Sequence, residues 1–116
     1  MPLDSRFEIL PEATAVLTLT GHITLGSSLA MLNAQLDRTI ADSVSFLAID
    51  LTGVDFCDSA GLGMLVNTHG LLKKKGGSLR LCAVHPHVLE LLRMTNMDTV
   101  IAIDADRAAS LAALGR

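Results

Sequence analysis

The sequence predicts an α/β fold, in which a five-stranded, mostly parallel mixed sheet is covered by about four helices in the chain order ββαβαβαβα. Three observations lead to this prediction. Residues 46–51 form a near-continuous apolar run, which is typical of a strand buried on both faces. Segments with the apolar spacing of a helix separate the later strand-like runs. Strands joined by helices of this length pair in parallel, through right-handed crossovers.

Length and composition narrow the possibilities further. The 116 residues suffice for one domain with a real core, and no linker or repeat divides them. We therefore expect a single domain over residues 1–116, with its core at about residues 7–114. Half of the residues are hydrophobic but only 3% are aromatic, so the core should be aliphatic. The net charge of −3 argues against direct nucleic-acid binding, which needs a basic surface.

Several features favour a cytoplasmic protein. No apolar run reaches the ~20 residues of a membrane span. The N-terminus has neither the basic flank nor the apolar stretch of a signal peptide. Cys57 and Cys82 are isolated in the sequence, and we expect both thiols to be reduced and partly buried.

The N-terminal part predicts a hairpin followed by a helix. Residues 6–9 alternate between polar and apolar, as in a short edge strand, and a proline soon breaks this run. Residues 16–20 predict a second strand, closed by Gly21. The pair Ser27-Ser28 is expected to cap the first helix. The apolar face of that helix is predicted to consist of Leu29, Leu32, Leu36 and Ile40.

The central strand should end at Thr52-Gly53 and lead into a second helix. That helix is expected to start at Asp58 or Ser59, because either side chain can cap its first free N–H groups. Cations at residues 73–75 and glycines directly after them are common at the end of a helix. The predicted inward face holds Leu62, Leu65, Val66 and Leu72, with Met64 and Leu71 on a neighbouring stripe.

The C-terminal part predicts two more strands and two more helices. Residues 79–83 alternate as a strand does, and Pro86 suits the first turn of a third helix that ends near Asn96. Residues 100–103 predict a short fifth strand, and Asp104 is expected to cap the last helix. The predicted inward residues are Val88, Leu91 and Leu92 in the third helix, and Ala108, Leu111 and Ala112 in the last.

Ser59 is the candidate functional residue. It lies where the central strand gives way to a helix, and in open α/β sheets ligands and partners are usually met at this edge. The first N–H groups of a helix lack internal partners and carry partial positive charge. Small neighbours, Ala60, Gly61 and Gly63, keep the surface around the hydroxyl low, so that another protein can approach it. The alternative is that Ser59 is only a helix cap, a common role for serine.

No motif in the sequence indicates an enzyme. Cys57 stands where a G-x-S-x-G nucleophile elbow needs its first glycine. Gly61 and Gly63 lack the third glycine of a dinucleotide loop, which disfavours a nucleotide-binding domain. His85 and His87 could in principle bind a metal, but no third ligand stands at a suitable spacing, and a surface turn is the simpler interpretation. We therefore predict no catalytic residue, no metal site and no cofactor.

The segment LAIDLTGVDFCDSAGLGMLV, residues 47–66, resembles the signature of STAS domains, in particular the bacterial anti-sigma factor antagonists (anti-anti-sigma factors). Residues 21–24 and 75–81 are similar to this family as well, and the resemblance extends over residues 7–114. In such proteins the serine directly after the aspartate is phosphorylated by the partner, an anti-sigma factor with histidine-kinase-like serine kinase activity. The unphosphorylated form binds that partner and frees the sigma factor. Phosphorylation ends the binding, and a serine phosphatase restores it.

By this resemblance, the phosphorylated residue is Ser59. The implied partner-binding residues are His22, Thr24, Gly26 and Ser27 in one segment, and Asp58, Ser59, Ala60, Gly61 and Leu62 in another. The chain departs from the family at Thr24, where an aspartate is common. A second function therefore stays open, namely a constitutive STAS interaction module such as a stressosome-like scaffold subunit or the accessory subunit of a lipid transporter.

Overall fold

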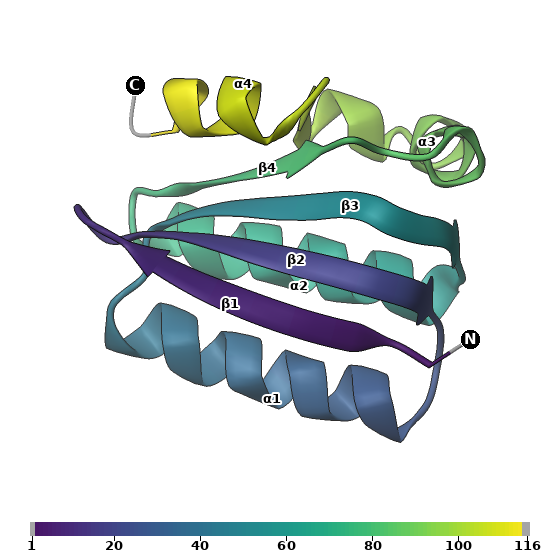
Figure 1. Ribbon diagram of the computed structural model, residues 1–116, viewed down its shortest axis with the longest axis horizontal. Helices are drawn as coiled ribbons and strands as arrows, with labels where there is room; N and C mark the ends of the chain where they lie inside the picture. The colour runs from purple at the N-terminus through teal and green to yellow at the C-terminus, as the bar shows by residue number, and fades with distance from the viewer. Residues whose placement is uncertain (1, 115–116) are drawn as a thin grey trace.

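The chain folds around one five-stranded sheet with helices on both faces (Figure 1). The structure is a computed structural model and describes residues 2–114. The elements follow the predicted order, with a short 3-10 helix, η1, added before the last strand. They are β1 (Asp4–Leu10), β2 (Thr14–Ile23), α1 (Ser27–Asp42), β3 (Phe46–Cys57), α2 (Ser59–Lys74), β4 (Ser78–Cys82), α3 (Pro86–Met94), η1 (Met97–Thr99), β5 (Ala102–Asp104) and α4 (Arg107–Ala113).

The sheet has the strand order β1-β2-β3-β4-β5. β1 pairs antiparallel with β2, and the other neighbouring pairs are parallel. This confirms the mostly parallel mixed sheet that the sequence predicts. Because parallel strands end at the same edge of a sheet, the segments that follow β2 and β3 meet there.

The face of the sheet that packs against α1 and α2 is apolar. Figure 1 shows α1 below the strands and α2 behind them. The helices α1, α2 and α3 contribute buried side chains to one continuous apolar cluster with the strands. The inward residues of α1 are those predicted, namely Leu29, Leu32, Leu36 and Ile40. In β3 every residue from Leu47 to Leu51 is buried, which confirms that this strand is covered on both faces.

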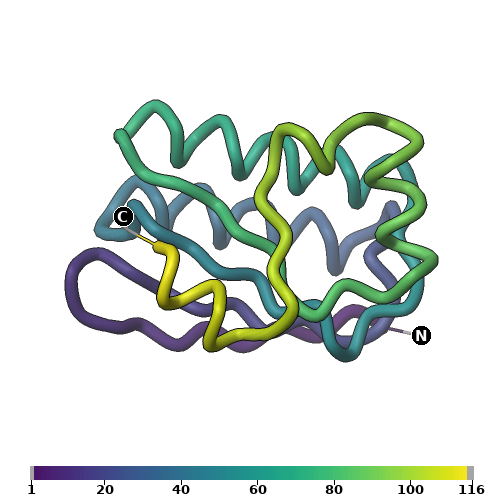
Figure 2. Tube along the Cα trace, turned by 90° about the horizontal axis from the view of Figure 1, so that it is seen from above, coloured from purple at the N-terminus to yellow at the C-terminus, as the bar shows by residue number. Residues whose placement is uncertain are grey.

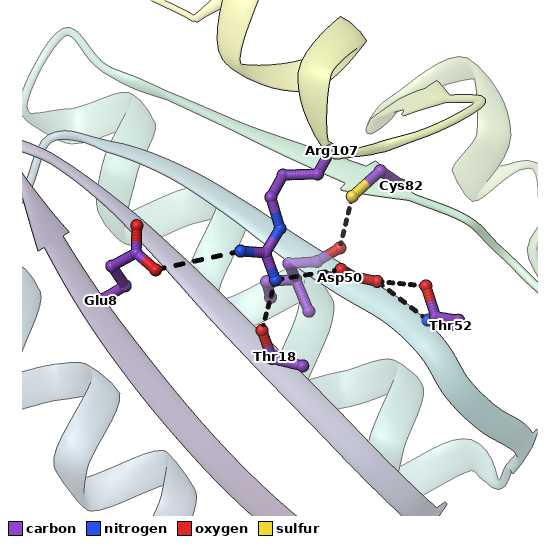
Figure 3. Close-up of polar contacts among 7 residues, drawn as sticks. Glu8, Thr18, Asp50, Thr52, Cys82 and Arg107 are labelled. Carbon is purple, nitrogen blue, oxygen red and sulfur yellow. Dashed lines mark hydrogen bonds and ion pairs between the residues drawn. The ribbon is translucent and has the colours of Figure 1, made fainter.

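The opposite face is more polar and is covered by α4. In Figure 2, α4 is the yellow segment that crosses in front of the strands. Arg107 of α4 donates from Nη2 to Thr18 Oγ1 at 2.9 Å and to Asp50 Oδ2 at 3.2 Å (Figure 3). Burial alone would raise the pKa of Asp50, but hydrogen bonds from Thr52 and Arg107 outweigh it and hold the pKa below its usual value. An ion pair thus holds α4 to this face, beside a small apolar cluster whose buried members are Val16, Ala48 and Leu114.

Two strands run further than predicted. β2 continues past Gly21 and β3 continues past Thr52-Gly53, so neither glycine ends its strand. The pairing of β2 with β3 instead changes register around Thr20 and Gly21. Gly21 has a φ of 99°, which favours glycine, and a Cβ on Gly53 would lie 2.6 Å from Thr20 Cγ2. The glycines therefore allow an irregularity within the pairing, as at a β-bulge, and both strands reach the carboxyl edge.

The inward face of α2 differs from the predicted one. Met64, Leu65 and Leu72 are buried, whereas Val66 is 41% exposed. Thr68 is buried as well. Its hydroxyl donates to the Met64 carbonyl oxygen at 2.8 Å, and this hydrogen bond offsets the cost of burying a polar group. A threonine whose polar group is satisfied in this way is missed by a search for apolar spacing, and the predicted face was therefore displaced.

The C-terminal helix also begins and packs differently. Asp106, and not Asp104, caps α4 by accepting a hydrogen bond from Ala109 N at 2.9 Å. Asp104 is the last residue of β5, and its carboxylate accepts from Arg80 Nε at 2.7 Å and from Ser110 Oγ at 2.6 Å. This network turns Ser110 inward. The two alanines that were predicted to face inward are exposed, namely Ala108 and Ala112.

Other predictions agree more closely with the structure. Pro86 opens α3, and that helix ends before Asn96, which adopts a left-handed φ of 60°. β5 starts at Ala102, later than predicted, and Val100 is exposed. The free thiols of both cysteines are buried. Within residues 2–114, none of the helices combines the length and the apolar character needed to cross a membrane.

Candidate functional site

Two segments meet at the carboxyl edge of the sheet. β2 and β3 end side by side, with Ile23 paired to Cys57. Asp58 N donates a hydrogen bond to the Ile23 carbonyl oxygen at 3.1 Å, which ties the start of α2 to the end of β2. Residues 22–27 are thereby brought against residues 58–62, the two segments that the motif indicates.

Asp58 links these segments through both of its carboxylate oxygens. Oδ2 accepts from Leu25 N at 2.9 Å, and Oδ1 accepts from Gly61 N at 2.9 Å as the cap of α2. The N–H groups of Leu25 and Gly61 stabilise the charged carboxylate and lower the pKa of Asp58 below its usual value. Since Asp58 is the cap, Ser59 is the first residue of the helix and its hydroxyl is not needed for capping.

The two glycines near Ser59 have different roles. A Cβ on Gly61 would lie 2.5 Å from the Ile23 carbonyl oxygen and 2.6 Å from Cys57 Sγ, so only glycine lets α2 approach the end of β2 this closely. Gly61 is accordingly buried. Gly63 is exposed, and a Cβ there would meet no atom within 4 Å. Gly61 is therefore required for close packing, whereas Gly63 leaves open space near Ser59.

Ser59 itself is exposed at the start of α2. Its hydroxyl has no hydrogen-bond partner among residues 2–114. The first N–H groups of α2 point towards the same end of the helix, where the partial positive charge of the helix favours an anion. The arrangement offers an accessible nucleophilic oxygen on a rigid element, beside a carboxylate that is already occupied.

The other predicted docking residues differ in how exposed they are. Ala60 and Leu62 are half-buried and pack against the core, while Gly26 and Ser27 are exposed at the start of α1. Thr24 is half-buried between Ile23 and Leu25. The His22 imidazole is engaged elsewhere, since Nε2 lies 3.0 Å from Asp55 Oδ1 and the ring meets Phe56 edge-on at 5.6 Å.

Much of the apolar surface near Ser59 was not predicted from the sequence, although Leu62 was among the expected docking residues. Leu25 is 80% exposed although its N–H is held by Asp58. A shallow and mainly apolar groove runs along α2 beside Ser59, lined by Ser59, Leu62, Gly63, Val66, Asn67, Thr95 and Met97. Val66 was assigned to the core, and residues 95–97 come from a turn that is distant in sequence. The available signal was Leu25, a large apolar residue within a loop of small and polar ones.

Two of the side chains considered for catalysis or metal binding, those of Cys57 and His85, are engaged in the fold. Burial, and then the charge of Asp58, raise the pKa of the Cys57 thiol to about 12, which makes it a poor nucleophile. His85 caps α3 by accepting from His87 N at 3.2 Å. Within residues 2–114, no three His, Cys, Asp or Glu side chains are grouped so that they could hold a metal ion.

Sequence relatives agree with the motif. The anti-sigma F factor antagonist of Paenibacillus polymyxa is 29% identical over 89 residues, which cover 76% of this chain and 75% of the relative. The anti-sigma-B factor antagonist of Bacillus subtilis is 36% identical over 66 residues, which cover 57% of this chain and 61% of the relative.

Solved structures share the fold. An anti-sigma factor antagonist from Mycobacterium paratuberculosis superposes with a TM-score of 0.86 at 24% identity, covering 99% of this chain and 96% of the other. The antagonist SpoIIAA in its unphosphorylated form gives a TM-score of 0.80 at 18% identity, covering 91% and 92%. The phosphorylated form of the Bacillus protein SpoIIAA gives 0.75 at 17% identity, covering 91% and 96%. The family model of the STAS domain matches residues 7–110, and the chain belongs to the STAS domain family.

Proposed function

We propose that this chain is an anti-sigma factor antagonist that is switched by phosphorylation of Ser59. In its unphosphorylated form it binds an anti-sigma factor with histidine-kinase-like serine kinase activity, and the sigma factor is released. The kinase transfers the γ-phosphoryl group of ATP to Ser59 Oγ, which loses its proton, and ADP leaves. The binding ends until a serine phosphatase hydrolyses the phosphoserine with water and releases inorganic phosphate. The chain is the substrate in this scheme and contributes no catalytic residue. The names of the two sequence relatives support the antagonist role.

One observation supports the proposed switch most directly. The Ser59 hydroxyl is exposed and has no hydrogen-bond partner among residues 2–114, while Asp58 caps the helix. If Ser59 were the cap, its oxygen would be committed to a backbone N–H, and phosphorylation would cost the helix that bond. Here Asp58 caps the helix and the adjacent Ser59 is left free to accept the phosphoryl group. The phosphoryl group can therefore be added without disturbing the cap, and SpoIIAA has been solved in both forms on this fold.

The docking surface we propose surrounds Ser59. It comprises His22, Thr24, Gly26, Ser27 and residues 58–62, to which the structure adds the exposed side chains of Leu25 and Val66. Of these residues Asp58 alone is acidic, since Thr24 stands where the family commonly has an aspartate. Apart from the Asp58 carboxylate, this surface carries no acidic group and is partly apolar, which suits a partner that buries it.

Phosphate would change the character of that surface. A phosphoserine carries roughly −1.5 to −2 charges near neutral pH, with three acceptor oxygens. The start of α2 tolerates this charge within the protein's own fold. A partner that buries Leu25 and the groove beside Ser59 would have to desolvate the phosphate, and Asp58 adds a like charge next to it.

The size of this effect is sufficient for a switch. Moving a complex from about 99% bound to about 1% bound requires a difference in binding free energy of about 5.5 kcal/mol. Burying one charge without a partner costs several kcal/mol, which is the same scale.

The test is the affinity of the anti-sigma factor kinase for the wild type, Ser59→Ala and Ser59→Asp, measured by calorimetry. Ser59→Ala should bind as the wild type does, because the side chain at position 59 stays small and uncharged. Ser59→Asp should bind more weakly, although less so than the phosphorylated protein, since a carboxylate carries less charge. Both variants keep the Asp58 cap and should unfold within about 0.5 kcal/mol of the wild type.

Ser28→Asp is the matched control, because Ser28 is an exposed serine in the first turn of α1 and lies outside the proposed docking residues. It should bind as tightly as the wild type. Equal affinity of all variants would remove Ser59 as the switch and favour a constitutive STAS interaction module.

A further inference from the structure

The outer edge of β1 is open. β1 is the first strand of the sheet and pairs with β2 alone among residues 2–114, and Figure 1 shows it as the outermost strand, above α1. Alternate N–H and C=O groups along its seven residues therefore point away from the sheet. The opposite edge is β5, which has only three residues. An exposed edge of this length is a template for another strand.

β1 carries a positive and a negative side chain on either side of its central residue, Phe7. Arg6 and Glu8 flank Phe7 and point to the α4 face, because they pair with Thr18 and Val16 on that side of β2. Arg6 is exposed and has no ion-pair partner among residues 2–114. The one ion pair of Glu8 in this part of the chain is long, with its Oε1 3.9 Å from Arg107 Nη1.

We propose that β1 pairs antiparallel with β1 of a second copy of this chain, about a twofold axis at Phe7. Arg6 of each copy then lies opposite Glu8 of the other, which gives two opposite-charge pairs across the interface. The register is also consistent with the backbone. Residues opposite one another, such as 6 and 8 or 5 and 9, are both even or both odd, so the groups that point outward on one copy meet the same set on the other.

The same register places an exposed apolar side chain over a groove. Ile9 is 61% exposed and lies on the α1 face of the sheet, since it pairs with Ala15 of the large apolar cluster. In the proposed pairing Ile9 of one copy lies opposite Ser5 of the other. Ser5 borders an open groove between β1 and α1, whose lining includes Leu3, Met31, Leu32 and Gln35. Met31 is 73% exposed there. Charge and shape thus favour the same register on the two faces of the strand.

The edge is separate from the site at Ser59, because none of the proposed docking residues belongs to β1. The dimer does not depend on the proposed function, and each can fail without the other.

Sedimentation velocity across a range of protein concentrations tests the pairing. The wild type should form a dimer. Arg6→Glu places two carboxylates opposite one another at both charge pairs, and Glu8→Arg places two guanidinium groups opposite one another there. Each variant should therefore raise the dissociation constant by at least about tenfold. An equimolar mixture of the two variants pairs a strand with two carboxylates against a strand with two guanidinium groups. This mixture restores opposite charges at both pairs and should form a heterodimer as stable as the wild-type dimer.

Charge reversals on α3 serve as controls, because Arg93→Glu and Glu90→Arg change the net charge by the same amount at exposed positions away from β1. Both controls should dimerise as the wild type does, and circular dichroism should show every variant folded. A wild type that stays monomeric at all concentrations would overturn the proposal. So would a dimer that tolerates both reversals, or a mixture that remains monomeric while the wild type dimerises.

Discussion

The two longest helices begin at the same edge of the sheet, each with an exposed serine as its first residue. Ser27 opens α1 and Ser59 opens α2, and both helices are 16 residues long. The helix starts differ in what precedes the serine. Gly26 precedes Ser27, and no side chain of residues 2–114 caps α1. Asp58 precedes Ser59, caps α2, and holds the loop before α1 through Leu25 N.

This difference shows that a serine at the first position of a helix is not by itself sufficient for a phosphorylation or docking site. Ser27 and Ser28 were predicted to be caps, yet the cap position falls on Gly26 and their side chains make no cap bond. Around Ser59 the backbone is held by Asp58 and by the close approach of Gly61 to Ile23. A kinase or partner would therefore meet Ser59 in a fixed geometry, whereas Ser27 stands on a helix start without a side-chain cap.

A side chain at position 61, where α2 approaches Ile23 closely, should change the stability more than any other substitution at this helix start. Gly61→Ala brings a Cβ against the Ile23 carbonyl oxygen and Cys57 Sγ, and should cost about 3 kcal/mol of unfolding free energy in urea titrations. The control is Gly63→Ala, which meets open space and should stabilise the helix by about 0.5–1 kcal/mol. Equal stability of the two variants would show that α2 does not depend on the contact with Ile23.

The two aspartate caps allow a finer comparison. Asp58 accepts two N–H groups on two oxygens, but Asp106 accepts one. Asp58→Asn must turn an NH₂ group towards one of its donors and should cost about 1–2 kcal/mol. Asp106→Asn keeps its single acceptor and should stay within about 0.5 kcal/mol of the wild type. Urea unfolding of both variants checks this, and a cost at Asp106 equal to that at Asp58 would mean that the Leu25 contact adds nothing.

The smallest expected effect is a pH dependence confined to the α2 start. The pKa of Asp58 is depressed by the N–H groups of Leu25 and Gly61, so the stability it contributes is present above the unfolded-state pKa of about 3.9 and is lost as the pH falls through the lower folded-state pKa. In NMR titrations, the Leu25 and Gly61 amide shifts should change with one shared midpoint below about 3.9. The amides of Ser27 and Ser28 should not follow that midpoint. Separate midpoints for Leu25 and Gly61 would contradict a shared carboxylate.

Much of the fold follows from local patterns in the sequence. The apolar run at residues 46–51 and the spacing of Leu29, Leu32, Leu36 and Ile40 identify the buried strand and the inward face of α1 correctly. These features depend on neighbours along the chain, which is why apolar periodicity captures them. The glycines at 21 and 53 were misinterpreted, because their role depends on how β2 and β3 pair, and that pairing joins residues far apart in sequence.

The site was only partly predictable for the same reason. The motif locates Ser59 and its aspartate neighbour, but the bond from Leu25 N to Asp58 spans 33 positions. The apolar groove joins α2 to the turn at residues 95–97, which no local pattern connects to Ser59. The lysine run shows a similar limit at the opposite end of α2. It was expected only to end the helix, yet Lys75 Nζ also donates to the carbonyl oxygens of Ile40, in the last turn of α1, and Val44, just after that helix.

The central claim is that Ser59, and not Ser27 or Ser28, is the residue on which the switch acts. The most direct test incubates the wild type, Ser59→Ala and the double variant Ser27→Ala/Ser28→Ala with the anti-sigma factor kinase and ATP. The number of phosphates is then read by intact mass and their position by fragmentation. We expect one phosphate on Ser59 in the wild type and in the double variant, and none in Ser59→Ala. Phosphate on Ser27 or Ser28 with none on Ser59 would contradict the claim.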